Sequence, residues 1–363
     1  MKSLLAALCM LPLLACAQTF PSLDAPYTYT TAPRIVKVRV IILNFQDDSS
    51  AYAKEDYRQW IWQGAGSARA LLSQWSRGDY VLQGRNSVDG SLDVFGPYTV
   101  PYSKTVCNDT AWVASAKAQA QAAGVVLTGI DHIVYVWKDV DACTWAGRML
   151  NSNVHMRAPG ISMASGEPVT VTAEAMIAHE LLHVQHSHSN GYLCVSGGSR
   201  VSMGTTSECT STEYAHPYDV MGARQADAPS AYIKMRWGWL APNEWLLNPC
   251  AGTYELEPHD ITPGGLQLIA IDRGNVSEFV RYLWIDYRQG IGVLLHVAAG
   301  HQYRDDISLI DTHPGTALPS DPVAHEFEDA PLQPGDQWTD PVSGYTIRFD
   351  SISAGKAVVV LTR

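Results

Sequence analysis

Three residues near the middle of the chain, His179, Glu180 and His183, have the types and the spacing of a catalytic zinc site. They lie in the segment A-H-E-L-L-H, which contains the pattern H-E-x-x-H. Side chains four residues apart share one face of a helix, so both imidazoles can reach one Zn²⁺ at roughly 2.0 to 2.1 Å. Glu180 then lies beside the metal, where a carboxylate can accept a proton from an attacking water. We therefore expect zinc-dependent hydrolysis, with a peptide bond as the natural target.

A catalytic zinc ion needs a third protein ligand, and the sequence offers several. His186 lies seven residues after His179 and would stay on the same face if the helix continued. His188 would point away from a continuous helix face, but it could swing back if the helix ended before it. Glu208 and Glu213 are carboxylate alternatives that would belong to a different arrangement of the site.

The zinc-binding residues need a helix to present them and a floor beneath the metal. Thr172 is a good N-cap, and Glu174 places a carboxylate in the first turn, so the helix should begin there. Downstream, Met221 stands in the segment Y-D-V-M-G, where a methionine turn could lie under the metal, although an isolated methionine is more often ordinary core.

Three side chains close to Met221 could stabilise the oxyanion that forms when a carbonyl is attacked: Tyr214, His216 and Tyr218. Residues of these types more often pack or form local hydrogen bonds.

The segments HELLHVQHSHSN and EYAHPYDVMG resemble the gametolysin family of metallopeptidases, which are metzincin zinc endopeptidases, and more distantly the immune inhibitor A family. RIVKVRVIILNFQD, CTWAG and AYIKMRWGWL add to the resemblance, in the same order along the chain. The resemblance implies that His179, His183 and His188 bind Zn²⁺, that Glu180 is the general base and that Met221 forms the methionine turn. The spacing to His188 is one residue shorter than the family's, which keeps His186 as an alternative.

The element pattern predicts an α+β fold. The following segments are expected as strand, helix, strand, helix and strand in this order: Arg34 to Phe45, Tyr57 to Trp75, Tyr80 to Gln83, Ala111 to Ala123 and Ile130 to Trp137. The Gly-, Ser- and Thr-rich stretch from Cys194 to Pro217 is expected as a long loop.

We divide the chain into a signal peptide (1–17), an N-terminal extension (18–33), a catalytic domain (34–249) and a smaller β-domain (250–363). The resemblance implies a metzincin-like catalytic domain, a twisted mixed sheet with a long active-site helix. The last part is predicted to be all-β and sandwich-like, because alternating stretches such as 282–287, 293–297, 345–349 and 357–361 are separated by turn residues. Asn248 and Pro249 mark the boundary.

The leader predicts export. Lys2 and the apolar stretch that follows it are typical of a secretory signal, with small residues at the cleavage site; lipidation of Cys16 is the alternative. Export to the extracellular space or the periplasm permits disulfides, and five cysteines follow the leader. Proximity favours the pairs Cys107–Cys143 and Cys194–Cys209, and the odd number leaves one cysteine unpaired or paired outside the chain.

Composition excludes some partners. The 363 residues carry a net charge of −11 and are 46% hydrophobic, which argues against binding nucleic acid or an anionic membrane surface. Beyond the leader we find no transmembrane segment. The expected partner is a protein or peptide substrate, with extracellular-matrix and cell-wall proteins as candidates. Two alternatives stay open: a surface-binding protein with a structural or vestigial zinc site, and a zinc amidase that acts on cell-wall material.

Overall fold

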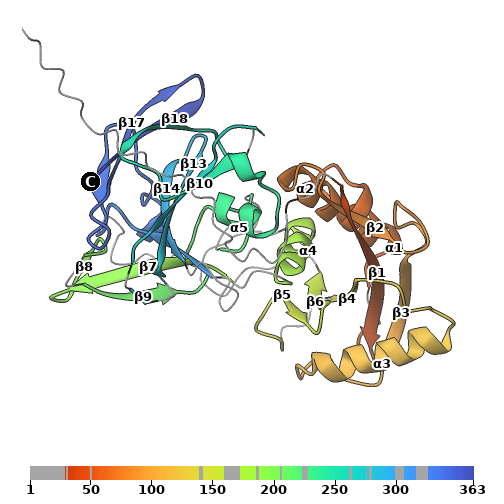
Figure 1. Cartoon of the computed structure of the whole chain (residues 1–363). Helices are drawn as coiled ribbons and strands as arrows, with labels where there is room; N and C mark the ends of the chain where they lie inside the picture. Colours follow the sequence, from red (N-terminus) through yellow and green to blue (C-terminus); the bar gives the residue numbers. More distant parts are fainter. Residues whose placement is uncertain are drawn as a thin grey trace, which may run out of the picture.

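The computed structural model describes residues 29, 32–49, 51–138, 142–158, 172–184, 188–204, 207–222, 228–260, 264–274, 276–277, 280–298, 306–315 and 326–363. The predicted signal peptide, most of the N-terminal extension and His186 lie outside these residues. The described part is a mixed α+β structure with three sheets and few helices, which confirms the predicted class (Figure 1).

The first sheet has six strands and contains the long strand predicted at the start of the catalytic region. β1 pairs in parallel with β2, β3 and β4, and the strand order β2-β1-β4-β6-β5 ends at β5, which runs antiparallel to β6. The strands are β1 (Arg34–Phe45), β2 (Tyr80–Gly84), β3 (Val94–Val100), β4 (His132–Lys138), β5 (Gly147–Leu150) and β6 (Asn153–Ala158). β5 is therefore an edge strand.

One of the two helices predicted between β1 and β4 is divided in the structure. The single helix predicted for Tyr57 to Trp75 is wrong, because two glycines interrupt it and Ser67 then caps a new helix. The helical elements are α1 (Lys54–Arg58), the π-helix η1 (Gln59–Gln63), α2 (Ala68–Trp75), α3 (Asp109–Ala122), α4 (Ala173–Leu182), α5 (Ala231–Arg236) and the 3-10 helix η2 (Pro242–Glu244). α4 has ten residues, fewer than the long helix that the resemblance implied.

The second sheet has eight strands in the order β10-β12-β13-β14-β15-β7-β8, with β9 also paired to β7. They are β7 (Ser189–Ser196), β8 (Ser199–Val201), β9 (Glu208–Thr212), β10 (Trp245–Leu247), β12 (Leu268–Asp272), β13 (Tyr282–Arg288), β14 (Gly292–Ala298) and β15 (Ile307–Ile310). The loop predicted from Cys194 to Pro217 is therefore wrong in part. Gly197 and Gly198, both with positive φ, close a hairpin there, and cross-strand pairing outweighs the low strand propensity.

The third sheet is antiparallel and consists of β11 (Gly252–Leu256), β16 (Gln337–Thr339), β17 (Thr346–Ser353) and β18 (Lys356–Thr362). The described residues from 250 to 363 carry strands and no α-helix, as the turn pattern predicted. Strands β7 to β10 precede residue 250 but belong to the second sheet, so the strand pairing does not follow the predicted boundary at 249/250.

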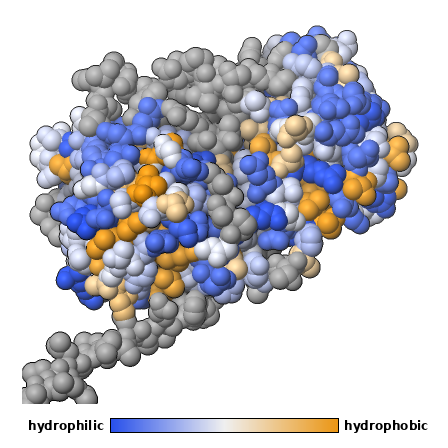
Figure 2. Space-filling model, turned by 90° about the horizontal axis from the view of Figure 1, so that it is seen from above, coloured by the Kyte–Doolittle hydropathy of each residue, from blue (hydrophilic) through white to orange (hydrophobic). Residues whose placement is uncertain are grey.

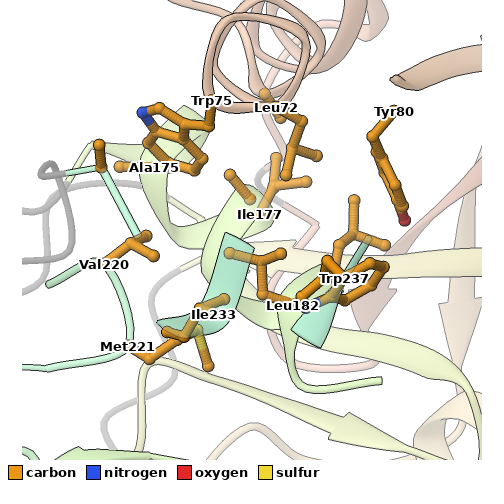
Figure 3. Packing of buried hydrophobic residues seen from close by; sticks show 14 of the residues in the cluster. Leu72, Trp75, Tyr80, Ala175, Ile177, Leu182, Val220, Met221, Ile233 and Trp237 are labelled. Atoms are coloured by element: carbon orange, nitrogen blue, oxygen red, sulfur yellow. The ribbon is translucent and has the colours of Figure 1, made fainter. Parts of the chain in front are cut away.

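The largest apolar core lies around α4. Figure 3 shows Leu72 and Trp75 of α2 on one side of this helix and Met221 with Ile233 of α5 on the other. α4 is buried almost all round, as an enclosed helix is expected to be. The position of α4 is thus fixed by its packing against α2 on one side and α5 on the other.

Two predicted disulfides are confirmed. Cys107 is bonded to Cys143 and Cys194 to Cys209, the second between β7 and β9. Cys250 is disulfide-bonded as well. Among the described helices, none has both the length and the apolar character that crossing a membrane requires.

Candidate metal centre

Helix α4 brings the three residues of the H-E-x-x-H pattern together near its C-terminus. The Thr172 hydroxyl accepts a hydrogen bond from the Ala175 amide, which confirms the predicted N-cap. The helix ends at Leu182, and His183 is its C-cap with helical φ and ψ. His183 therefore projects from the same helix face as His179, which lies one turn before it.

The two imidazoles and the Glu180 carboxylate form a compact donor set. One candidate ligand atom from each of His179, Glu180 and His183 lies within 4.8 Å of the others. The His179 and His183 rings are perpendicular, at 89°, with centroids 4.6 Å apart. This is the one group of three or more candidate metal-ligating side chains in the described ranges.

The loop that carries Met221 fixes the protonation of His179. Nδ1 of His179 lies 2.7 Å from the Val220 carbonyl oxygen. A carbonyl can only accept, so Nδ1 carries the proton and Nε2 keeps its lone pair for a metal. Burial, together with the nearby His183, lowers the pKa of His179 to about 3, so this imidazole is neutral at physiological pH. A neutral imidazole is the form that binds metal.

Glu180 is buried without a compensating partner. Its side chain lies inside the protein, and Oε2 has no hydrogen-bond partner. Burial raises the pKa of Glu180 to about 8. A cation beside the carboxylate would favour its ionised form. The orphaned oxygen, the neutral His179 imidazole and the neighbouring His183 imidazole therefore fit a divalent metal ion.

Met221, the residue predicted to form a methionine turn, follows Val220, whose carbonyl oxygen contacts Nδ1 of His179. Its side chain is fully buried, and its loop is held by Asp219, whose carboxylate accepts hydrogen bonds from the amides of Met221 and Ser230. A β-carbon on Gly222 would lie only 2.0 Å from the His216 carbonyl oxygen, so this position of the Y-D-V-M-G segment requires glycine. The whole turn is thus specified by backbone contacts.

The candidates for the third ligand are placed differently. The His188 ring lies 5.5 Å from the His183 ring, but its Nε2 is 3.1 Å from Oε1 of Glu213, which is largely exposed. His188 is therefore next to the donor set without being part of its 4.8 Å group. Glu208 begins β9 on the strand pair β7–β9, and His186 lies outside the described residues.

Sequence reasoning assigned no role to Gly147, which contacts the Glu180 carboxylate. A β-carbon at Gly147 would come within 2.5 Å of Oε1 of Glu180. Gly147 begins the edge strand β5, so this strand runs directly past the carboxylate. Gly147 is the last residue of the segment C-T-W-A-G, one of those on which the family resemblance rests. This resemblance was the sequence signal from which a role of Gly147 could have been inferred.

Comparison of the sequence with protein-family models and with curated proteins finds no match. We therefore assign a function from the chemistry and geometry of the site residues.

Proposed function

We propose that this protein is an exported, zinc-dependent endopeptidase with a metzincin-like catalytic region, related to the gametolysin family. One observation carries the proposal: candidate ligand atoms of two histidines and of an unpartnered buried carboxylate lie within 4.8 Å of one another, next to the loop that carries the buried Met221. A structural zinc site has no need of a general base. The position of Glu180 therefore favours a catalytic site.

Zinc fits this donor set. His179 and His183 would hold it through ring nitrogens, with the proton of His179 Nδ1 retained by the Val220 carbonyl. The ion, when bound, polarises a carbonyl and lowers the pKa of water. We assign His188 as third ligand because its ring lies beside that of His183. To bind zinc through Nε2, His188 would give up its contact with the Glu213 carboxylate. The loss of this contact costs little free energy, because Glu213 is largely exposed and surface ion pairs are weak.

Glu180 carries out the proton transfers of the reaction. It accepts a proton from water as the water oxygen bonds to the peptide carbonyl carbon, and the carbonyl π electrons move to oxygen. When the carbon–nitrogen bond breaks, Glu180 returns the proton to the leaving amine nitrogen. The low-polarity surroundings that raise its pKa also make its carboxylate a stronger base than an exposed one.

The edge strand β5 offers a binding surface for an extended peptide. It ends the six-stranded sheet, so its outer backbone groups are not used by another strand of that sheet. An edge strand can bind a peptide by main-chain hydrogen bonds, largely independent of side chains. Because β5 begins at Gly147, against Glu180, a peptide paired there would pass the carboxylate. This arrangement favours cleavage within a chain.

Two further features support an exported protein. The disulfides Cys107–Cys143 and Cys194–Cys209 are typical of oxidising compartments. We propose protein substrates in the extracellular space or periplasm, with matrix and cell-wall proteins as candidates. The predicted leader is the reason to expect export through the general secretory route.

The test combines metal analysis with proteolysis of casein by the purified full-length protein. We expect about one zinc per chain, loss of cleavage with a chelator and its return when zinc is added. Glu180→Gln should keep zinc and lose cleavage by several orders of magnitude, because only the proton transfer is removed. His188→Ala should lose zinc, whereas His186→Ala should retain it.

Three other results of this test would contradict the endopeptidase proposal. Absence of zinc would refute the proposal. Zinc without cleavage of casein, but with release of amines from wall polymer, would favour the amidase alternative. Zinc with neither activity would point to a structural site in a binding protein.

A further inference from the structure

Three side chains near the methionine turn could stabilise an oxyanion, and two of them are already engaged. His216 is fully buried, its Nε2 lies 2.9 Å from Nε2 of His296, and its Nδ1 accepts a hydrogen bond from the Tyr218 amide. The Tyr218 hydroxyl donates to the Glu328 carbonyl oxygen. Neither group can turn to a substrate without giving up these bonds.

Tyr214 is placed against the metal-binding imidazoles. Its ring centroid lies 4.4 Å from that of His188 and 5.9 Å from that of His179. Its phenol is close enough to Glu180 for the two groups to interact electrostatically. Tyr214 thus lies next to the donor set.

The Tyr214 hydroxyl has no hydrogen-bond partner in the described part of the chain, and it is not among the fully enclosed polar atoms. The hydroxyl of Tyr57, by contrast, is both unpartnered and enclosed. The Tyr214 hydroxyl is therefore accessible to a ligand that enters the site. A tyrosine hydroxyl can donate one hydrogen bond to such a ligand.

The backbone at Tyr214 is held in an uncommon conformation. Its φ is +58°, a left-handed value that bulky residues rarely adopt. The Tyr214 amide donates to Oδ1 of Asn190, whose own side chain donates to Ser211, so the strained turn is fixed from β7. Strain that is fixed in this way concentrates at functional sites, where it aims a side chain.

We propose that the Tyr214 hydroxyl donates a hydrogen bond to the carbonyl oxygen of the scissile peptide as negative charge develops on it. This inference rests on the proposed endopeptidase activity. The water oxygen bonds to the carbonyl carbon, Glu180 takes the water proton, and the π electron pair moves to the carbonyl oxygen, where Tyr214 meets it. The hydrogen bond strengthens in the transition state and so lowers the barrier.

The test is Tyr214→Phe, which removes only an oxygen that has no hydrogen-bond partner among the described residues. On an internally quenched peptide based on a casein cleavage site, kcat should fall about 100-fold with little change in KM. Affinity for a phosphinic analogue of that peptide should fall by a similar factor, whereas affinity for the cleaved N-terminal product should not change. Zinc content and melting temperature should match the wild type.

Tyr218→Phe is the matched control, because its hydroxyl donates to the Glu328 carbonyl and not to the site. It should keep kcat and phosphinate affinity and lose only some stability. A Tyr214→Phe enzyme with wild-type kcat, or with a raised KM and unchanged kcat, would overturn the assignment of Tyr214 while leaving the peptidase proposal intact. A wild type that binds zinc but cleaves nothing would overturn both.

Discussion

Gly147 shows how little room surrounds the Glu180 carboxylate. The β-carbon of any other residue at this position would lie 2.5 Å from Oε1 and 2.9 Å from the carboxyl carbon. Either the β5 backbone or the carboxylate must then move. Since misplacement of a catalytic group by about 1 Å can cost about 100-fold in rate, we expect Gly147→Ala to lower kcat by that order.

Zinc content should be unaffected in Gly147→Ala, because the three atoms nearest to the added β-carbon all belong to the Glu180 side chain. Gly66→Ala is the control: no atom lies within 4 Å of its β-carbon position and its φ is ordinary. The measurement is peptide hydrolysis with metal analysis of both variants. Full activity in Gly147→Ala would mean that the carboxylate does not need its present position.

Of the residues at the site, the sequence predicted those that lie on a single helix and few of the others. His179 and His183 could be assigned because the helix period places them on one face, and Glu180 because it directly follows His179 in the H-E-x-x-H pattern. Tyr214 and Gly147 come from other elements, and their approach to the site depends on tertiary packing. The position of His188 depends on where α4 ends, which the sequence left open between two helix lengths.

Among the elements, the loop before the methionine turn is tied to β14 by one buried pair, His216 and His296. Burial lowers the pKa of His296 to about 3. Below pH 6.5 the unfolded chain takes up a proton that the folded protein excludes, so this contribution to stability is complete above pH 6.5. It is lost as the pH falls from 6.5 towards 3, by up to about 1.4 kcal/mol per pH unit.

We therefore expect the free energy of unfolding to depend less on pH between 6.5 and 4 in His296→Gln, which keeps an acceptor for His216. Urea unfolding at a series of pH values measures this slope. His313→Gln serves as control, because His313 lies near the surface and is far less enclosed than His296. An equal slope in the wild type and His296→Gln would contradict the prediction.

Elements with strong local signals were predicted well. The predicted strand at Arg34 to Phe45 coincides with β1, whose second half is mostly apolar because its side chains pack into hydrophobic clusters on both faces of the sheet. Elements that depend on distant partners were not predicted: β8 and β9 consist largely of residues with weak strand preference and exist through pairing with β7. The amino-acid composition of β8 and β9 does not indicate that they pair with β7.

Across the whole molecule, the segments on either side of residue 249 share one core. The cluster around α4 includes residues of the second sheet such as Trp284 and Ile307. β7, which follows α4, pairs in parallel with β15. On the face seen in Figure 2, hydrophobic residues occur in patches among hydrophilic ones, as on an ordinary protein surface.

Several buried polar contacts cross the same boundary. Asp286 of β13 accepts a hydrogen bond from the amide of Ala231 at the start of α5, and Lys234 of α5 donates to the His259 carbonyl. Arg288 donates to the Tyr218 carbonyl, close to the methionine turn. Removing the C-terminal part would leave these groups buried without partners or exposed together with a large apolar face.

We therefore expect a chain truncated after residue 249 to lack a stable fold, although composition suggests a boundary there. It should show no cooperative thermal unfolding by circular dichroism and no stoichiometric zinc, because α5 and the methionine turn lose the strands that hold them. Supplying residues 250–363 as a separate chain is the control, since the shared core gives the two pieces a reason to associate and recover zinc binding. A truncated chain that melts cooperatively and binds zinc alone would show that the first 249 residues fold on their own, and that the shared sheet reports docking between two domains.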